Sequence, residues 1–289
     1  MIRSFKGLTV LVTGASSGIG ESFARRLNAA VLGLEKYPGL PSFDELWLVA
    51  RRGDRLETLA GELNNFHASA AMGNGRAALR IRTFPADLVS EGALVALKIA
   101  AKSTGKPVRI LVNNAGYGTY GPFSESDLNR QLGQIDLNCR ALTEACGLFD
   151  PLLGQGSLVI NVASLAAFAP LGGFAVYAAS KAYVLSFSVA LAAEWKSRGI
   201  RVQALCPGSV ESEFALVASE GVRTEVLHGW SADRTTTISL RHAGRSQIIS
   251  LPRLSWKVQR FATALVGPVI SAVFAQRFLQ RPHKGKSSE

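Results

Sequence analysis

A tyrosine and a lysine lie four residues apart in the segment Tyr177-Ala178-Ala179-Ser180-Lys181. On a helix, this spacing places both side chains on one face. A phenol is a poor proton-transfer group at its ordinary pKa of about 10. A cation about 4 Å away contributes roughly 4 kcal/mol at an effective dielectric of 20, which lowers that pKa by about three units. The pair predicts a tyrosine general acid for a carbonyl oxygen, although the spacing alone also arises by chance.

A glycine-rich turn, Thr13-Gly14-Ala15-Ser16-Ser17-Gly18-Ile19-Gly20, joins an expected strand to an expected helix. Glycines let a phosphate approach the backbone because no Cβ is in the way. Free N–H groups at the start of the helix attract the same phosphates. The position of the turn favours a dinucleotide diphosphate, and the absence of GK[ST] excludes the P-loop of nucleoside triphosphatases.

Two arginines, Arg51 and Arg52, follow the expected second strand. An acidic residue at this point accepts hydrogen bonds from the ribose hydroxyls of NAD, whereas an arginine suits the 2′-phosphate of NADP. Surface arginines are common, but this place in the chain favours Arg51 as the phosphate ligand, assisted by Arg52. NADP(H) is therefore the expected cofactor.

Short apolar runs alternate with helical patterns along the chain. Strands are expected at residues 8–13, 46–50, 79–84, 108–112, 157–162, 200–205 and 247–251. Helices are expected at 53–65, at 90–102 with Ser90 as N-cap, and at 177–197; 28–44 reads as a long loop. The alternation predicts an α/β fold, a doubly wound Rossmann-type parallel sheet with helices on both faces.

Composition indicates one globular domain. Of 289 residues, 47% are hydrophobic and 18% charged, which excludes general disorder. The three cysteines form no CxxC pair and the four histidines are scattered, so neither a disulfide scaffold nor a metal site is expected, and a cytoplasmic location fits. No signal-peptide pattern precedes the first strand, and the longest uncharged run, 261–276, is shorter than a membrane-spanning helix.

Positive charge is concentrated at the C-terminal end. The net charge is +11, and residues 241–289 hold nine Lys or Arg against one acid. Such a tail can attract nucleic acid, anionic lipid or an acidic partner, or can be a solvated end that aids solubility. No nucleic-acid-binding motif accompanies it, so nucleic acid is not an expected partner.

Five ordered motifs resemble those of the short-chain dehydrogenase/reductase family. They are TGxxxGxG at 13–20, NNAG at 113–116, a serine at 164, YxxxK at 177–181 and PG at 207–208. The match covers roughly residues 5–215, and the run Leu-Val-Ala-Arg-Arg at 48–52 resembles the branch that prefers NADP. Beyond Phe214, where the family builds its substrate pocket, the resemblance is faint.

The resemblance implies reduction of a ketone or aldehyde with NADPH, or the reverse reaction, by a tetrad of Asn138, Ser164, Tyr177 and Lys181. Tyr177 protonates the developing alkoxide and Ser164 donates a hydrogen bond to it. Lys181 holds the nicotinamide ribose and lowers the Tyr177 pKa, and Asn138 holds a relay water. The implied cofactor-binding residues are Gly14, Ser16, Ser17, Gly18, Ile19, Gly20, Arg51, Arg52, Asp87, Leu88, Asn114, Ala115, Gly116, Tyr177, Lys181, Pro207, Gly208, Val210 and Ser212.

We expect residues 1–252 to form the NADP-binding domain, with a substrate loop at about 212–246, and 253–289 to form a basic helical C-terminal extension. Two helices, 255–267 and 268–280, are expected there, with Pro268 as the first residue of the second. Phe261, Leu265 and Val269 recur every four residues. This stripe is expected to cap the substrate pocket or the core; a peripheral membrane contact is the alternative.

Other functions on the same fold are open at this point. One is a non-catalytic NADP-binding sensor or scaffold whose tail contacts a membrane surface or a partner, although four occupied catalytic positions argue against it. The helix at 177–195 is apolar around most of its circumference, so it is buried in the core or against a second subunit. The resemblance favours a homodimer or homotetramer and a small-molecule carbonyl or alcohol as substrate.

Overall fold

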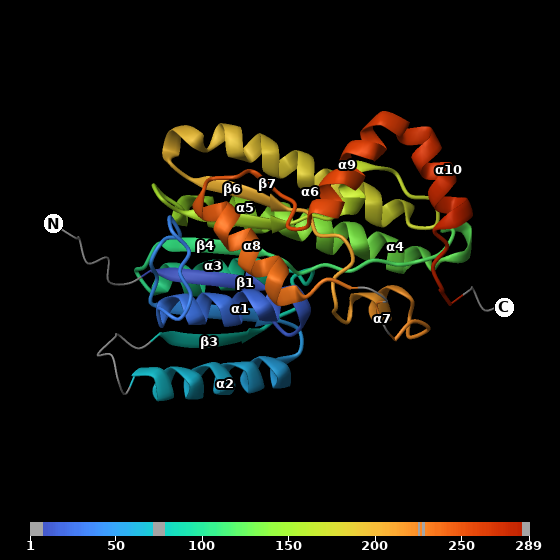
Figure 1. Ribbon diagram of the computed structural model, residues 1–289. Helices are drawn as coiled ribbons and strands as arrows, with labels where there is room; N and C mark the ends of the chain where they lie inside the picture. The colour runs from blue at the N-terminus through green and yellow to red at the C-terminus, as the bar shows by residue number, and fades with distance from the viewer. Residues whose placement is uncertain (1–7, 72–78, 225, 227–228, 285–289) are drawn as a thin grey trace.

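The computed structural model describes residues 8–71, 79–224, 226 and 229–284. Seven parallel strands form one sheet in the order β3-β2-β1-β4-β5-β6-β7 (Figure 1). They are β1 (Thr9–Thr13), β2 (Glu45–Ala50), β3 (Arg80–Pro85), β4 (Val108–Asn113), β5 (Leu158–Val162), β6 (Arg201–Leu205) and β7 (Ile249–Ser250). The predicted Rossmann-type parallel sheet is confirmed, although β7 pairs with β6 over two residues only.

The central strands are buried on both faces, as is usual for a parallel sheet. Side chains alternate between the faces along a strand. Leu11 of β1 therefore joins one core with Trp47 and Phe149, while its neighbour Val10 joins the other with Phe23. The two cores fix the sheet and hence the strand ends that carry the site.

Helices cover both faces of the sheet (Figure 1). They are α1 (Gly18–Val31), α2 (Gly53–Ala71), α3 (Ala93–Ser103), α4 (Leu128–Ile135), α5 (Leu142–Phe149), α6 (Ala175–Glu194), α7 (Phe214–Ala218), α8 (Ala232–Gly244), α9 (Leu254–Val266) and α10 (Pro268–Phe278). Helix α1 packs with α2 and α8, while α3 packs with α5 and α4 with α6.

Several predicted boundaries are wrong by a few residues. Helix α3 begins at Ala93 rather than at Ser90, because Gly92 before it has a left-handed backbone with φ +76°. Helix α1 continues to Val31, into the predicted loop, and α2 continues past residue 65 to Ala71. Residues 72–78 of the second long connection lie outside the described residues.

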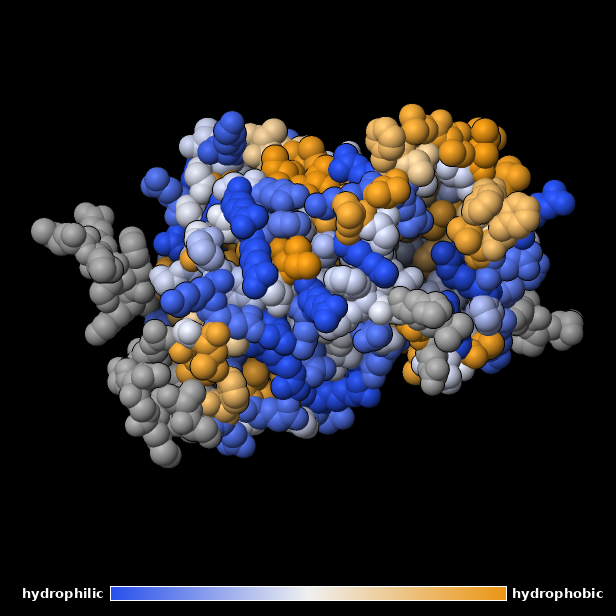
Figure 2. Space-filling model, viewed as in Figure 1, coloured by the Kyte–Doolittle hydropathy of each residue, from blue (hydrophilic) through white to orange (hydrophobic). Residues whose placement is uncertain are grey.

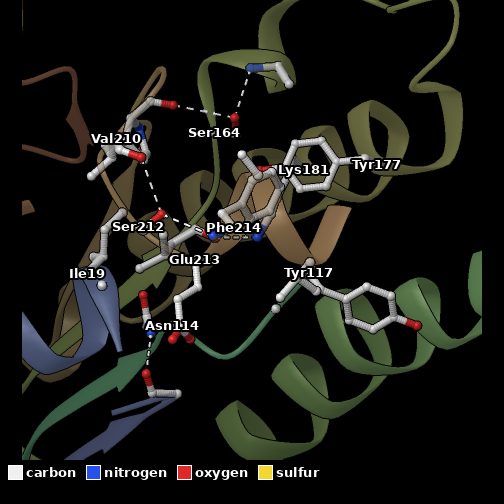
Figure 3. A pocket seen from close by; sticks show the side chains of 18 of the residues that line it. Ile19, Asn114, Tyr117, Ser164, Tyr177, Lys181, Val210, Ser212, Glu213 and Phe214 are labelled. Atoms are coloured by element: carbon white, nitrogen blue, oxygen red, sulfur yellow. Dashed lines mark hydrogen bonds between the residues drawn. The ribbon is translucent and has the colours of Figure 1, made fainter. Parts of the chain in front are cut away.

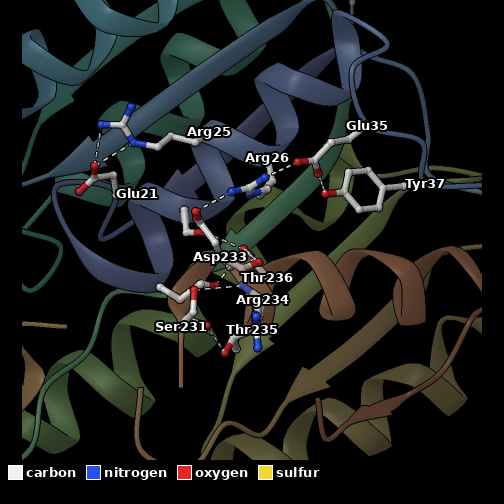
Figure 4. A network of polar contacts seen from close by, with 12 residues as sticks. Glu21, Arg25, Arg26, Glu35, Tyr37, Ser231, Asp233, Arg234, Thr235 and Thr236 are labelled. Carbon is white, nitrogen blue, oxygen red and sulfur yellow. Dashed lines mark hydrogen bonds and ion pairs between the residues drawn. The ribbon is translucent and has the colours of Figure 1, made fainter. Parts of the chain in front are cut away.

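The long connection between α1 and β2 packs against α8 (Figure 4). Arg26 of α1 pairs with Glu35 of this connection and, at 2.5 Å, with Asp233 of α8. The backbones also meet closely, since a Cβ on Gly39 would lie 2.3 Å from the carbonyl oxygen of Gly244. The insertion therefore joins the first helix to the last helix before β7.

The C-terminal helices α9 and α10 meet at a bend of 117° (Figure 1). Pro268 is the first residue of α10, as predicted. The expectation that the apolar stripe caps the pocket or the core is wrong: Phe261, Leu265 and Val269 are 67%, 73% and 74% exposed. The inward side of α9 is instead the one that carries Trp256, which is 5% exposed.

Within the described part of the chain, α6 has the length and apolarity of a membrane span, and the bent pair α9–α10 passes the same test when its two helices are taken together. Helix α6 packs against β5 and β6. Its inward side chains Val184 and Ser188 are fully buried, whereas Tyr183 and Val189 on the outer side are exposed. Helix α6 is thus a core helix with one partly open face.

Candidate active site

A cavity of about 700 Å³ lies at the carboxyl ends of the strands, where the strand order reverses between β1 and β4. Open α/β sheets bind ligands at such points. All the site residues predicted from the sequence line this cavity except Gly20 and Asn138. Figure 3 shows several of them around one space, namely Ile19, Asn114, Ser164, Tyr177, Lys181, Val210 and Ser212.

The glycines of the first loop are required by contacts within the protein. Gly14 has φ +64°, and a Cβ there would lie 2.7 Å from Asn114 Nδ2, which donates to the Gly14 carbonyl at 3.2 Å. A Cβ on Gly18 would lie 2.9 Å from the Cβ of Ser212. A Cβ on Gly20 would lie 2.1 Å from the Gly14 carbonyl oxygen. The expectation that Gly20 binds the cofactor is corrected: Gly20 lies in the first turn of α1 and lets that turn pack against the Gly14 carbonyl.

The two arginines after β2 lie differently. Arg51 is exposed at the cavity, and among the described residues its guanidinium has no hydrogen bond or ion pair. Arg52 turns back onto the glycine loop and donates to Ser16 Oγ at 3.0 Å and to Ser17 Oγ at 2.9 Å. It also pairs with Glu213 at 2.7 Å. Arg51 is therefore open to a ligand, whereas Arg52 already has partners.

Glu213 is a cavity residue that sequence reasoning missed. Partial burial opposes its ionisation, but hydrogen bonds from Arg55 and Arg52 hold its pKa below the usual range. Its carboxylate thus adds negative charge beside the arginines. The ion pairs of Glu213 with Arg52 and Arg55 join segments more than 150 residues apart, so no local sequence pattern predicts them.

Tyr177 and Lys181 share one face of α6, as their spacing predicts, with Lys181 Nζ 5.7 Å from the centre of the phenol ring. Nζ donates to the carbonyl oxygen of Val162, at the end of β5, at 2.9 Å. Ser164 follows the same strand and is hydrogen-bonded to the Tyr177 side chain. Its Oγ also lies 3.4 Å from the Pro207 carbonyl oxygen. The ends of β5 and β6 therefore hold both groups against α6.

Burial governs the ionisation of this pair. It raises the pKa of Tyr177, although the hydrogen bond with Ser164 opposes the rise. Burial also lowers the pKa of Lys181 to about 8. The net pKa of the phenol in this structure is therefore above its ordinary value, opposite in direction to the one predicted from the Tyr–Lys spacing, because the phenol is withdrawn from water. A phenol that keeps its proton at neutral pH is suited to donating it.

Asn138 lies behind the cavity, in a π-helical segment, Asp136–Ala141, between α4 and α5. Such segments are frequent at functional sites. Its Oδ1 accepts from the backbone N–H of Tyr117 at 3.1 Å, and its Nδ2 donates to the Tyr117 carbonyl and to Ser180 Oγ. A Cβ on Gly116 would lie 2.7 Å from this Oδ1 and 3.4 Å from Lys181 Nζ. Asn138 therefore clamps the loop after β4 beside the lysine.

Aromatic rings pack around Tyr177. Phe174 stacks on the phenol at a centroid distance of 4.2 Å, and Phe214 lies 5.2 Å away. Tyr120 packs on Phe174 at 4.8 Å. Sequence reasoning missed these rings, although Phe174 precedes Tyr177 by three residues. They make this half of the cavity apolar and suited to a flat or bulky organic group.

The C-terminal helices form one wall of the cavity. A Cβ on Gly208 would lie 2.4 Å from Trp256 Nε1, so α9 packs directly on the turn after β6. Gln259 and Thr263 of α9 and Leu279 after α10 line the same space. The inner side of these helices therefore belongs to the site, and their exposed side does not.

Known proteins resemble this chain in sequence and structure. The family model described as short chain dehydrogenase matches residues 44–222. A serine 3-dehydrogenase of Agrobacterium fabrum is 33% identical over 74% of this chain and 76% of its own length. A short-chain dehydrogenase of Sphingobium yanoikuyae, solved with NADPH, is 30% identical with a TM-score of 0.71, covering 88% of this chain and 92% of that one.

A third comparison extends the fold over almost the whole chain. A short-chain dehydrogenase/reductase of Burkholderia phymatum, solved with NAD, covers 99% of this chain and 100% of its own, with a TM-score of 0.73 and 19% identity. The family match and the sequence relatives place the protein in a definite class: it belongs to the short-chain dehydrogenase family. Its structural neighbours bind nicotinamide cofactors of both kinds.

Proposed function

We propose that the protein is an NADP(H)-dependent oxidoreductase that interconverts a ketone or aldehyde and an alcohol. The observation that carries this proposal is the convergence of Ser164, Tyr177 and Lys181 in the cavity that also receives the glycine loop. The loop, the N-terminus of α1 and the unpaired Arg51 fit a dinucleotide phosphate. A bound nicotinamide cofactor supplies or accepts the hydride.

The chain's own residues handle the proton and the carbonyl oxygen. In the reductive direction, Tyr177 Oη donates its proton to the alkoxide oxygen, and Ser164 Oγ donates a hydrogen bond to the same oxygen. Fixed donors aimed at developing charge are worth several kcal/mol of barrier. Lys181 Nζ donates one hydrogen bond to the Val162 carbonyl oxygen. Its two other N–H groups can donate to the cofactor ribose and to a relay water beside Asn138. These four residues are the proposed tetrad.

We further propose that Arg51 gives a preference for NADP(H). A charge-assisted hydrogen bond contributes about 1.5–3 kcal/mol, so Arg51→Ala is expected to weaken NADPH binding roughly 10- to 150-fold and to leave NADH binding nearly unchanged. Calorimetric titration with both cofactors measures this. Arg241→Ala, at an exposed arginine of α8 that does not line the cavity, is the control and is expected to bind both cofactors like the wild-type protein. A wild-type protein that binds NADH better contradicts the preference.

The activity itself is tested by following NADPH absorbance over a series of ketones and aldehydes. The proposal expects turnover of at least one carbonyl compound and greatly reduced turnover of the same compound by Ser164→Ala. A protein that binds NADPH tightly yet reduces no member of a broad series supports the alternative, a cofactor-binding sensor or scaffold.

The exposed side of the C-terminal helices favours a second role, contact with an anionic membrane surface. Large apolar side chains gather there (Figure 2). They are Leu254, Val258, Phe261, Leu265, Val266, Val269, Ile270, Val273, Phe274 and Phe278, each at least 46% exposed. Exposed apolar surfaces of this kind mark contact sites for membranes or other proteins.

The positive charge around this apolar surface favours an anionic membrane as its binding partner. Exposed Lys257, Arg260, Arg277 and Lys284 lie on or next to the two helices, and residues 234–288 contain no acid. Basic residues near anionic lipid contribute about 1 kcal/mol each, and an exposed apolar helix face dips into the headgroup region. A second copy of the chain brings the same positive charge to this face, so like-charge repulsion opposes a dimer here.

Co-sedimentation with vesicles tests the membrane contact. Phosphatidylglycerol vesicles are expected to bind the wild-type protein at low salt, phosphatidylcholine vesicles much less, and Phe261→Asp/Leu265→Asp not at all. Ile99→Asp, which changes an exposed apolar residue of α3, is the control and is expected to bind normally. If the double variant instead converts a dimer to a monomer in sedimentation velocity, and the wild-type protein ignores both vesicles, the surface is a subunit interface of the expected homo-oligomer.

A further inference from the structure

The segment after α10 carries a guanidinium into the aromatic half of the cavity. Arg281 lines the cavity, and its Cζ lies 5.0 Å from the ring centre of Phe174 and 5.4 Å from that of Tyr120. Phe174 in turn stacks on Tyr177. One ring therefore separates the cation from the proposed proton donor.

The chain holds Arg281 in place through its neighbours on both sides. Before it, a Cβ on Gly172 would lie 2.6 Å from the Gln276 side chain. After it, His283 pairs with Glu125 at 3.2 Å, and a Cβ on Gly121 would lie 2.6 Å from the His283 ring. Two close contacts and one polar pair thus fix the segment against the loops that surround the cavity.

Arg281 lacks a counterion in this position. Among the described residues, no carboxylate forms an ion pair with it, and the only hydrogen bond of its guanidinium is a long one, 3.5 Å, to the carbonyl oxygen of Leu279. Burial lowers its pKa, and the charge of Arg223 acts in the same direction. A half-buried cation without a carboxylate partner is unfavourable, and stacking on two rings offsets only part of that cost.

A ligand can supply the missing negative charge. We propose that Arg281 binds a carboxylate or similar oxyanion on the substrate, while Phe174, Phe214 and Tyr120 hold an apolar body between that group and the reacting carbonyl. The inference rests on the proposed function and deepens it: the substrate class becomes an anionic carbonyl compound with a flat or bulky apolar part. Planar guanidinium suits this task because it binds carboxylates with two parallel hydrogen bonds.

A ketone with a carboxylate and its neutral methyl ester test the proposal. The wild-type protein is expected to reduce 4-acetylbenzoate with a higher kcat/KM than methyl 4-acetylbenzoate. Arg281→Gln is expected to lower kcat/KM for the acid about 10- to 150-fold, which corresponds to loss of a charged hydrogen bond, and to change that for the ester less than about threefold. Arg281→Lys keeps the charge and is expected to recover part of the loss.

Arg245→Gln is the control, because Arg245 is an exposed arginine at the end of α8 that does not line the cavity. It is expected to behave as wild type on both ketones. NADPH affinity and thermal midpoint, measured for all variants, verify that the fold and the cofactor site are intact. Equal losses on acid and ester, or a wild-type preference for the ester, overturn the proposal and leave Arg281 as a packing residue.

A binding measurement separates this proposal from the catalytic one. Calorimetry with 4-ethylbenzoate and 4-ethylbenzamide, which have no ketone to reduce, needs no turnover. The acid is expected to bind the wild-type protein more tightly than the amide, and Arg281→Gln is expected to abolish the difference. If no ketone is reduced but this difference is present, the catalytic proposal fails and the anion site stands. If the variant keeps the difference, the anion site fails whatever the activity.

Discussion

Replacing Lys181 by methionine is expected to change how stability depends on pH. Burial lowers the pKa of Lys181 from 10.5 to about 8. Between pH 8 and 10.5 the unfolded chain therefore holds a proton that the folded chain has released, so the free energy of unfolding rises with pH in this window. At about 1.4 kcal/mol per pKa unit, the gain is about 3 kcal/mol. Lys181→Met removes it.

Urea unfolding of the wild-type protein and the variant, followed by tryptophan fluorescence at several pH values from 7 to 10.5, measures this difference. The free energy of unfolding of wild type minus variant is expected to stay constant below pH 8 and then to increase by about 3 kcal/mol. Lys102→Met, at an exposed position of α3, is the control and is expected to show no such increase. A difference that stays flat or falls above pH 8 refutes the burial argument.

Two further variants test the geometry of the cofactor half of the cavity. Gly20→Ala is expected to lower stability by about 1–3 kcal/mol and to weaken NADPH binding, because the added Cβ would lie 2.1 Å from the Gly14 carbonyl oxygen; thermal unfolding and calorimetry measure both effects. Glu213→Gln is expected to lower the free energy of unfolding by at most about 1 kcal/mol, since the ion pairs of Glu213 are partly exposed. It is also expected to tighten NADPH binding a few-fold at low salt, because it removes a carboxylate beside the arginines.

The sheet was predictable because each strand leaves a local trace. Runs such as residues 108–112 are short, apolar and bounded by turn residues, and each of the seven predicted segments contains an observed strand or most of one. Helix boundaries were less predictable where the backbone conformation of one residue decides them. Gly92 shortens α3 through its left-handed φ, and no hydrophobic pattern reports that angle.

The glycine-loop side of the cavity was predictable for a similar reason. Asn114 and Ser164 follow strand ends, and Lys181 lies four residues after Tyr177 on one helix, so short motifs were enough to predict that these residues meet at the cavity. The aromatic side was not, because it is assembled from distant segments. Arg281 reaches the cavity because α10 packs on the loop at 171–174 and the segment after it packs on the loop at 118–125. Phe261 of α9 faces outward, against expectation.

The most direct test of the central claim compares Tyr177→Phe with the wild-type protein on the best carbonyl substrate, under saturating NADPH, with NADPH affinity measured beside it. The phenylalanine keeps the stacking on Phe174 and removes only the proton donor. General acid catalysis contributes about 10²- to 10⁴-fold, so kcat is expected to fall by that factor while the NADPH dissociation constant stays within about twofold. A Tyr177→Phe protein with full turnover contradicts the assignment of Tyr177 as the proton donor and the mechanism built on it.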